Sequence, residues 1–188
     1  MTYGLPTILE VNGREYPIET DFRAVLDVFE LINDPELTNQ DKAIGTLYIM
    51  YPDFDPEGES PMPADDYGEA LKKAYWFING GAEEVEKKAP KLIDWEQDYS
   101  YIVAPINRVL GAEVRALEYL HWWTFLAAYY EIGDCLLSQI VRIRKLKAQG
   151  RLKDKADREW YRENRELVDF KVVYTDAEKD ILAEWGLK

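Results

Sequence analysis

The feature that most constrains the fold is a dense aromatic run at residues 117–130, which reads Leu-Glu-Tyr-Leu-His-Trp-Trp-Thr-Phe-Leu-Ala-Ala-Tyr-Tyr. It carries the only histidine of the protein, His121. The spacing of its apolar residues predicts a helix of about 15 residues. Large aromatic side chains either bury much area in a core or anchor a contact with a partner. We expect most of these rings to pack inside, and a minority, Trp122 and Tyr129, to touch a partner.

The rest of the chain also has mainly helical patterns, preceded by one strand signal. Asn12-Gly13 stands between two short apolar segments, which predicts a β-hairpin over residues 7–18. Pro105 should kink the helix that contains it or end its first half. The fold class is therefore mainly α, a multi-helix bundle of about six to eight helices with a short N-terminal hairpin. The expected helices cover residues 22–32, 38–51, 64–78, 94–109, 117–130, 136–150, 154–168 and 175–185.

The length of 188 residues suits one domain with a short appendage. We expect a single helical domain over residues 1–170, which includes the hairpin, and a short helix or tail over residues 171–188. The N-terminus has no basic segment followed by a long apolar run, so no signal peptide is expected. The longest apolar stretch is too short and too polar to span a bilayer. The single cysteine, Cys135, excludes an internal disulfide and fits a reducing cytosol.

The residues offer no convincing catalytic or metal site. A zinc site lacks ligands, because His121 has no second histidine and Cys135 lies in a separate expected helix. A Ser-His-Asp arrangement with Ser100 or Ser138 lacks the Gly-x-Ser-x-Gly setting of a nucleophile elbow. The favoured interpretation is a histidine packed between aromatic rings, with one ring nitrogen bonded to the backbone. We expect no enzyme activity, no metal and no cofactor.

Two charged segments remain to be interpreted. The acidic loop at residues 53–59 lacks the ligand order of an EF-hand and is predicted to be solvated. The segment 141–155 carries seven basic residues and one acid, whereas the whole chain has a net charge of -13. Three interpretations stay open for this basic run. They are a solvated helix end, a docking surface for an acidic partner such as another copy of the chain, and, least favoured, a nucleic-acid patch.

Five short segments stand out by their order and spacing: Tyr16–Arg23, Asn33–Leu37, Asp94–Ile102, Leu120–Leu126 and Ile140–Arg144. Together they resemble the bacteriophage gene product 15 family, a group of small tailed-phage proteins of siphophages and prophages of Gram-positive bacteria. The resemblance covers roughly residues 5–170.

The resemblance implies a role in tail morphogenesis. Members are usually encoded beside the tape-measure gene, a position typical of tail assembly chaperones, which bind the tape-measure protein and keep it soluble in the host cytoplasm. Such proteins are not enzymes and need no cofactor. The alternative is a structural virion component of the tail or connector. We expect self-association and no membrane partner. The candidate partner-binding residues are Trp95, Tyr99, Trp122, Trp123, Tyr129, Arg142, Arg144, Lys145 and Lys147.

Overall fold

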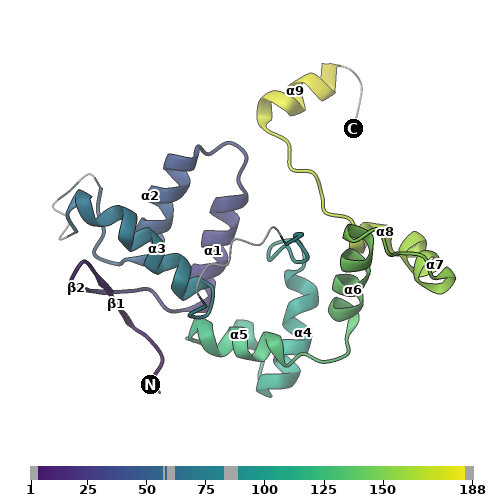
Figure 1. Cartoon of the computed structure of the whole chain (residues 1–188), viewed down its shortest axis with the longest axis horizontal. Coiled ribbons are helices and arrows are strands. Elements are labelled where there is room, and N and C mark those ends of the chain that lie inside the picture. Colours follow the sequence, from purple (N-terminus) through teal and green to yellow (C-terminus); the bar gives the residue numbers. More distant parts are fainter. Residues whose placement is uncertain (1–3, 57, 59–61, 83–88, 185–188) are drawn as a thin grey trace. The chain divides into compact units, whose positions relative to one another are not determined.

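The computed structural model describes residues 4–56, 58, 62–82 and 89–184. The chain forms two compact units, and Figure 1 labels their helices and strands. The first unit comprises Met1–Glu84 with Val172–Lys188, and the second comprises Val85–Lys171. The fold is mainly α with an N-terminal hairpin, which confirms the predicted fold class. The expected single domain over residues 1–170 stays a prediction.

The first unit opens with the predicted hairpin. Strand β1 (Ile8–Val11) pairs antiparallel with β2 (Arg14–Pro17), and Val11 lies opposite Arg14. The two loop residues, Asn12 and Gly13, have φ angles of 49° and 80°. Positive φ at both positions is what a type I′ turn requires, so the Asn-Gly signal determined this turn as predicted.

Three helices and a short 3-10 turn complete the ordered core of the first unit. The N-cap Asp21 accepts from the Arg23 N–H, and Thr38 forms a capping box with Asp41. Helix α1 packs against α2, α2 against α3, and α3 against β1. Their bounds are α1 Phe22–Asn33, α2 Asn39–Met50, η1 Ala64–Asp66 and α3 Tyr67–Ile78.

A buried carboxylate fastens η1 to the hairpin. Asp66 is 3% exposed. It accepts hydrogen bonds from Asn12 Nδ2 at 2.9 Å, from Arg14 Nη1 at 2.7 Å and from Tyr16 Oη at 2.9 Å. These contacts join residues that are 50 to 54 positions apart in the chain and compensate the loss of hydration of the carboxylate.

The described part of the second unit contains five α-helices and one 3-10 turn. Helix α9 (Asp176–Glu184) belongs to the first unit, and Figure 1 labels these helices. The described residues thus hold nine α-helices, because the helix expected at 154–168 divides at Asn164. Asn164 leaves the helical conformation with φ at -117°, and its side-chain amide donates to the Trp160 carbonyl. Helix α4 continues through Pro105, so the proline does not end it. The bounds are α4 Tyr99–Leu110, η2 Val114–Ala116, α5 Trp122–Tyr130, α6 Leu136–Ala148, α7 Lys155–Glu163 and α8 Arg165–Val168.

The structure corrects the starts of two predicted helices. The aromatic run is helical only from Trp122, because the extended His121 is the N-cap and its Nδ1 accepts the Trp123 N–H at 3.0 Å. The helix expected from Asp94 starts at Tyr99. The carboxylate of Asp98 accepts the Asp94 N–H at 3.0 Å and holds the preceding residues in turns. At α5 the His121 side chain thereby satisfies a backbone donor that a longer helix would have used.

Two sequence predictions extend beyond the residues that the structure describes. Glu57 and Glu59 of the acidic loop lie outside them, as does Trp185 at the expected end of the last helix. Among the described residues, no helix combines the length and the apolar character that a bilayer crossing requires.

Candidate functional site

The predicted aromatic surface contributes in part to the core of the second unit. The Trp95 ring lies 5.6 Å from that of Trp122 and 5.1 Å from that of Tyr129, and Trp122 stacks on Phe125 with centroids 5.6 Å apart. Trp122 and Phe125 are fully buried. Of the other rings in the run, Trp123 and Tyr129 are half-buried, and Tyr119 and Tyr130 are exposed. The prediction that most of these rings pack inside therefore holds in full only for Trp122 and Phe125. The expectation that Trp122 touches a partner is wrong, because its side chain has no exposed surface.

Four other members of the predicted aromatic set are half-buried: Trp95, Tyr99, Trp123 and Tyr129. Burial raises the pKa of Tyr129 to about 12, with smaller contributions from neighbouring negative charge. On α4, Ile102 and Ile106 share one face of the helix and have no exposed surface. That face therefore stabilises the unit and cannot form an open groove. Partner contact by the half-buried rings stays a prediction.

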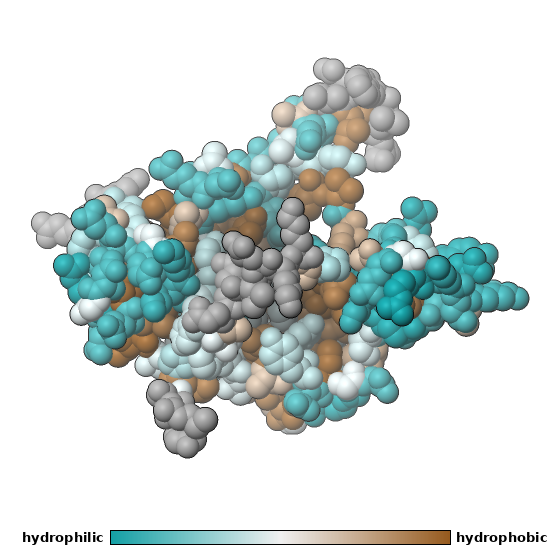
Figure 2. Space-filling model, viewed as in Figure 1, coloured by the Kyte–Doolittle hydropathy of each residue, from teal (hydrophilic) through white to brown (hydrophobic). Residues whose placement is uncertain are grey.

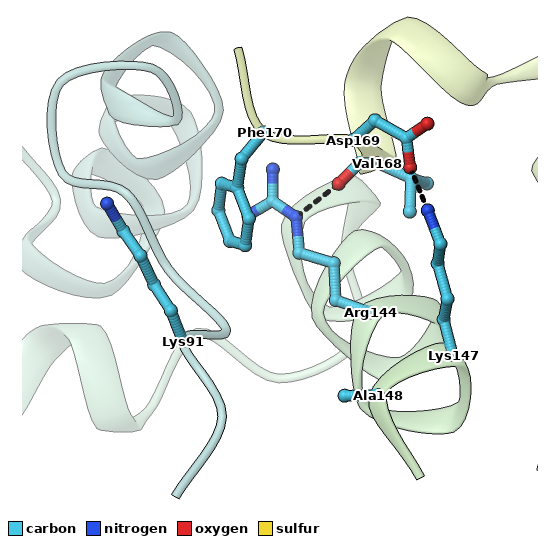
Figure 3. Close-up of a pocket in the computed structure, with 7 residues that line it drawn as sticks. All are labelled: Lys91, Arg144, Lys147, Ala148, Val168, Asp169 and Phe170. Atoms are coloured by element: carbon cyan, nitrogen blue, oxygen red, sulfur yellow. Dashed lines mark hydrogen bonds and ion pairs between the residues drawn. The ribbon is translucent and has the colours of Figure 1, made fainter. Parts of the chain in front are cut away.

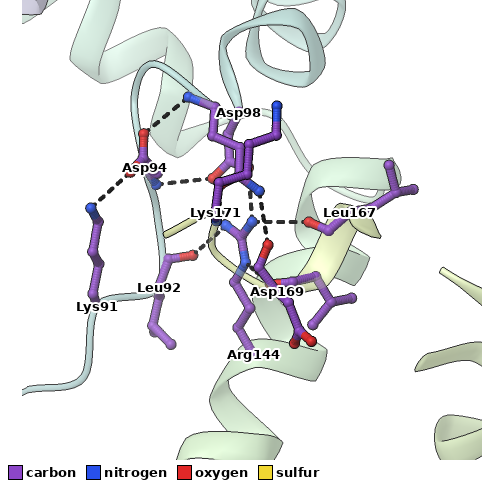
Figure 4. A network of polar contacts seen from close by, with 10 residues as sticks. Lys91, Leu92, Asp94, Asp98, Arg144, Leu167, Asp169 and Lys171 are labelled. Atoms are coloured by element: carbon purple, nitrogen blue, oxygen red, sulfur yellow. Dashed lines mark hydrogen bonds and ion pairs between the residues drawn. The ribbon is translucent and has the colours of Figure 1, made fainter. Parts of the chain in front are cut away.

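Arg144 is the polar centre of the second unit (Figure 4). It is 4% exposed, and its guanidinium forms a two-pronged ion pair with the fully buried Asp98, at 2.5 and 2.9 Å. It also donates to the carbonyls of Leu92 at 3.0 Å, Leu167 at 3.0 Å and Val168 at 2.7 Å. The five N–H groups of the guanidinium are thereby used. Such complete pairing is what makes a buried charge tolerable, so Arg144 has a structural role and is not accessible to a partner.

The segment at residues 167–171, here called the strap, is held mainly through its backbone. Arg144 binds two of its carbonyls, as described above. Gln97 donates to the Asp169 carbonyl and accepts the Lys171 N–H, each at 3.0 Å. The Phe170 ring lies over the guanidinium, with its centroid 4.1 Å from the central carbon of Arg144. The strap therefore connects α6 and the 92–98 turns in one polar network.

A pocket of about 340 Å³ lies beside the strap (Figure 3). Its cations are already paired. Lys91 contacts Asp94 at 2.8 Å, and Lys147 pairs with Asp169. Because each charge has an opposite charge beside it, the pocket has no surplus positive charge for an anionic ligand. Its lining residues are Lys91, Arg144, Lys147, Ala148, Val168, Asp169 and Phe170.

The basic run at residues 141–155 is therefore partly internal. Three of its seven cations form ion pairs: Arg142 with Asp157, Arg144 with Asp98, and Lys147 with Asp169. The other four have no acid within ion-pair distance among the residues that the structure covers, and all four are exposed. They are Lys145, Arg151, Lys153 and Lys155.

A second, apolar pocket of about 270 Å³ lies between α4 and the start of α6. On α4 it is lined by the exposed Ala104 and the buried Pro105, and on α6 by Leu136, which is 45% exposed. Arg108 stands at its edge and donates to the Ile132 carbonyl. We call this pocket the α4–α6 groove. The remaining lining residues are Ser100, Tyr101 and Cys135.

Sequence reasoning missed the α4–α6 groove. Apolar periodicity in α4 indicates the buried face that contains Ile102 and Ile106. The groove is lined by residues outside that pattern, which include Ser100 and Ala104. An available signal was Leu136, an apolar side chain at the first position of α6, where it cannot share the buried face of Leu137.

The prediction that the lone histidine packs against aromatic rings and bonds the backbone through one ring nitrogen is confirmed. His121 is 4% exposed, lies edge-on to Trp123 and uses one ring nitrogen on the backbone. At the start of α6, the Ser138 hydroxyl accepts a hydrogen bond from the Cys135 N–H and donates one to the Cys135 carbonyl. Within the described part of the chain, no group of three or more His, Cys, Asp or Glu side chains is arranged to hold a metal ion.

Comparison with known proteins identifies the family. The family described as Bacteriophage Gp15 protein matches residues 1–170, which is most of the chain. No curated protein and no solved structure was found to match. The α4–α6 groove, the Arg144 network and the hairpin all lie within the matched region, and the chain belongs to the Bacteriophage Gp15 protein family.

Proposed function

We propose that this protein is a tail assembly chaperone that binds the tape-measure protein of its phage and keeps it soluble in the host cytoplasm. It acts by binding alone, without catalysis or a cofactor. Membership of a bacteriophage family supports a phage-related role. The choice of a chaperone among such roles follows the sequence resemblance described above.

The observation that carries the proposal is the α4–α6 groove. A tape-measure protein is long and helical, so its apolar stripes need temporary cover before tail-tube subunits surround it. A helix binds a groove by inserting apolar side chains at positions three and four apart. The groove offers Ala104 and Leu136 as exposed apolar contacts, and the nearby helix α5 ends in Tyr130, which is 69% exposed. Apolar contacts of this kind tolerate many sequences, as a holdase requires.

The charge of the chain suits the same role. With a net charge of -13, a complex of many copies on one tape-measure protein would remain soluble through mutual repulsion. The repulsion also disfavours nucleic acid as the partner, because phosphate carries the same sign.

Co-expression of the chain with the tape-measure protein of the same phage tests the proposal. The expected result is a soluble complex that co-purifies. A variant with Ala104→Glu and Leu136→Glu should lose most of this activity, because two carboxylates would have to be desolvated in the groove. Tyr48→Glu on α2 is the matched control, since Tyr48 is 63% exposed in the first unit. A tape-measure protein that stays insoluble beside the folded wild-type chain would overturn the proposal, and equal solubilisation by both variants would exclude the groove.

A further inference from the structure

The charges of the chain are divided unequally between its two units. The segments of the first unit carry 22 acidic and 7 basic residues, a net charge of -15, whereas the second unit carries 14 acidic and 16 basic residues, a net charge of +2. Long-range electrostatic attraction between two copies is therefore most favourable where the second unit of one faces the first unit of the other. The question is whether each unit offers a surface that fits.

The basic surface is a stripe along α7. Lys155, Arg158 and Arg162 follow at spacings of three and four, which places them on one face of the helix, and all three are exposed. Arg162 reaches Glu159 of the same helix at 3.6 Å. Neither Lys155 nor Arg158 has an acid within ion-pair distance in the described part of the chain. Helix α7 has no buried residue, and its surface is predominantly hydrophilic (Figure 2).

The acidic surface is a stripe along α1 with the same spacing. Asp27 and Glu30 are exposed on α1, and Asp34 follows four residues later as the half-buried, extended C-cap of the helix. No base pairs with these three acids among the described residues. Partial burial, and next the neighbouring charge of Glu30, raise the pKa of Asp27. Asp34 is attracted electrostatically to Lys179, although Lys179 forms its ion pair with Asp176. Asp27 and Glu30 are therefore the central acids of the stripe.

We propose that the basic stripe of α7 in one copy docks on the acidic stripe of α1 in a second copy. We identify the partner as a second copy of the chain because the two stripes have opposite charges at matching spacing and because the two units differ in net charge. The contact joins two different surfaces, so each added copy leaves one stripe of each kind free, and the assembly grows as a chain or closes as a ring. The inference goes beyond the proposed function and does not depend on the tape-measure protein.

The contact is weak between free copies and sensitive to salt. An exposed ion pair changes affinity by up to about fivefold, and ions at about 0.15 M screen charges beyond roughly 8 Å. Copies held side by side on one long partner would have a much higher effective concentration, and a weak contact is then sufficient to order them.

Sedimentation velocity of the full-length chain, over a range of concentrations at low and high salt, tests the inference. The expected result is concentration-dependent association at low salt that weakens at high salt. Lys155→Glu with Arg158→Glu should reduce the association by about tenfold or more, and Asp27→Lys with Glu30→Lys should do the same. An equimolar mixture of the two variants should associate again, because one retains the native acidic stripe and the other the native basic stripe.

The matched control is Lys72→Glu with Lys73→Glu on α3, which changes the net charge as much as the α7 variant and should associate like the wild type. Circular dichroism establishes that each variant is folded. A wild-type chain that stays monomeric at low salt and high concentration would overturn the inference. So would a mixture that remains monomeric, or a control that loses association equally. None of these outcomes bears on tape-measure binding, which the co-expression experiment measures separately.

Discussion

Replacing Arg144 by methionine should cost the second unit a large share of its stability. Methionine keeps much of the apolar length of the side chain but removes five hydrogen bonds, two of them to a fully buried carboxylate. Breaking a buried ion pair by removing one partner costs about 3–5 kcal/mol, because the remaining charge is left without compensation. Domains are stable by only about 5–15 kcal/mol in total.

Urea unfolding followed by tryptophan fluorescence measures this cost. The second unit contains Trp95, Trp122, Trp123 and Trp160, so the signal reports mainly on it. The exposed neighbour Lys145 provides the control, since Lys145→Met should change the free energy of unfolding by no more than about 0.5 kcal/mol.

A double-mutant cycle isolates the ion pair from other effects of substitution. Asp98→Leu alone should also destabilise strongly, because it leaves the Arg144 guanidinium buried without its carboxylate. The double variant should cost less than the sum of the two single variants, with a coupling free energy of about 2–3 kcal/mol. A loss below about 1 kcal/mol for Arg144→Met would refute the assignment of Arg144 as the polar centre of the unit.

Three further predictions concern local contacts. Hydrogen bonds from Asn12, and then from Tyr16 and Arg14, hold the pKa of Asp66 below its usual value. The charged carboxylate therefore stabilises the fold fully above the unfolded pKa of about 3.9. This stabilisation is lost as the pH falls through the lower pKa of the folded state. Unfolding curves from neutral to acidic pH should accordingly show Asp66→Asn costing stability at pH 7 and progressively less below about pH 4. At the N-cap of α5, His121→Asn should have a higher melting temperature than His121→Ala, because the amide oxygen of asparagine can still accept the backbone N–H. Equal melting temperatures for the two variants would contradict the capping role of His121. At α2, Thr38→Ala should cost about 1 kcal/mol in urea unfolding, and no measurable change would mean that the capping box adds nothing.

The sequence predicted the hairpin and most helices because their signals are local. Positive φ at Asn12 and Gly13 follows from the two residue types themselves, and Thr38 needs only Asp41 three residues on to form its cap. The starts of α4 and α5 were predicted several residues too early, since apolar periodicity continues across His121 although its side chain begins the helix there.

The candidate site could be predicted only in part, because its contacts connect distant residues. Arg144 looked like one member of an exposed basic run until folding placed Asp98, 46 residues away, against it. A pattern of charges along the chain does not reveal which of them will be buried and paired. Trp122 had the same ambiguity, since an aromatic ring in a helix suits a core and a contact surface equally well.

The copy number of the chain relative to the tape-measure protein, measured by quantitative mass spectrometry, tests the central claim most directly. The comparison is between complexes isolated from lysate during tail assembly and purified phage particles. A chaperone should co-purify with the tape-measure protein in the lysate and be absent from the particles. A fixed, stoichiometric amount in the particles would contradict the account and identify the chain as a structural component of the virion.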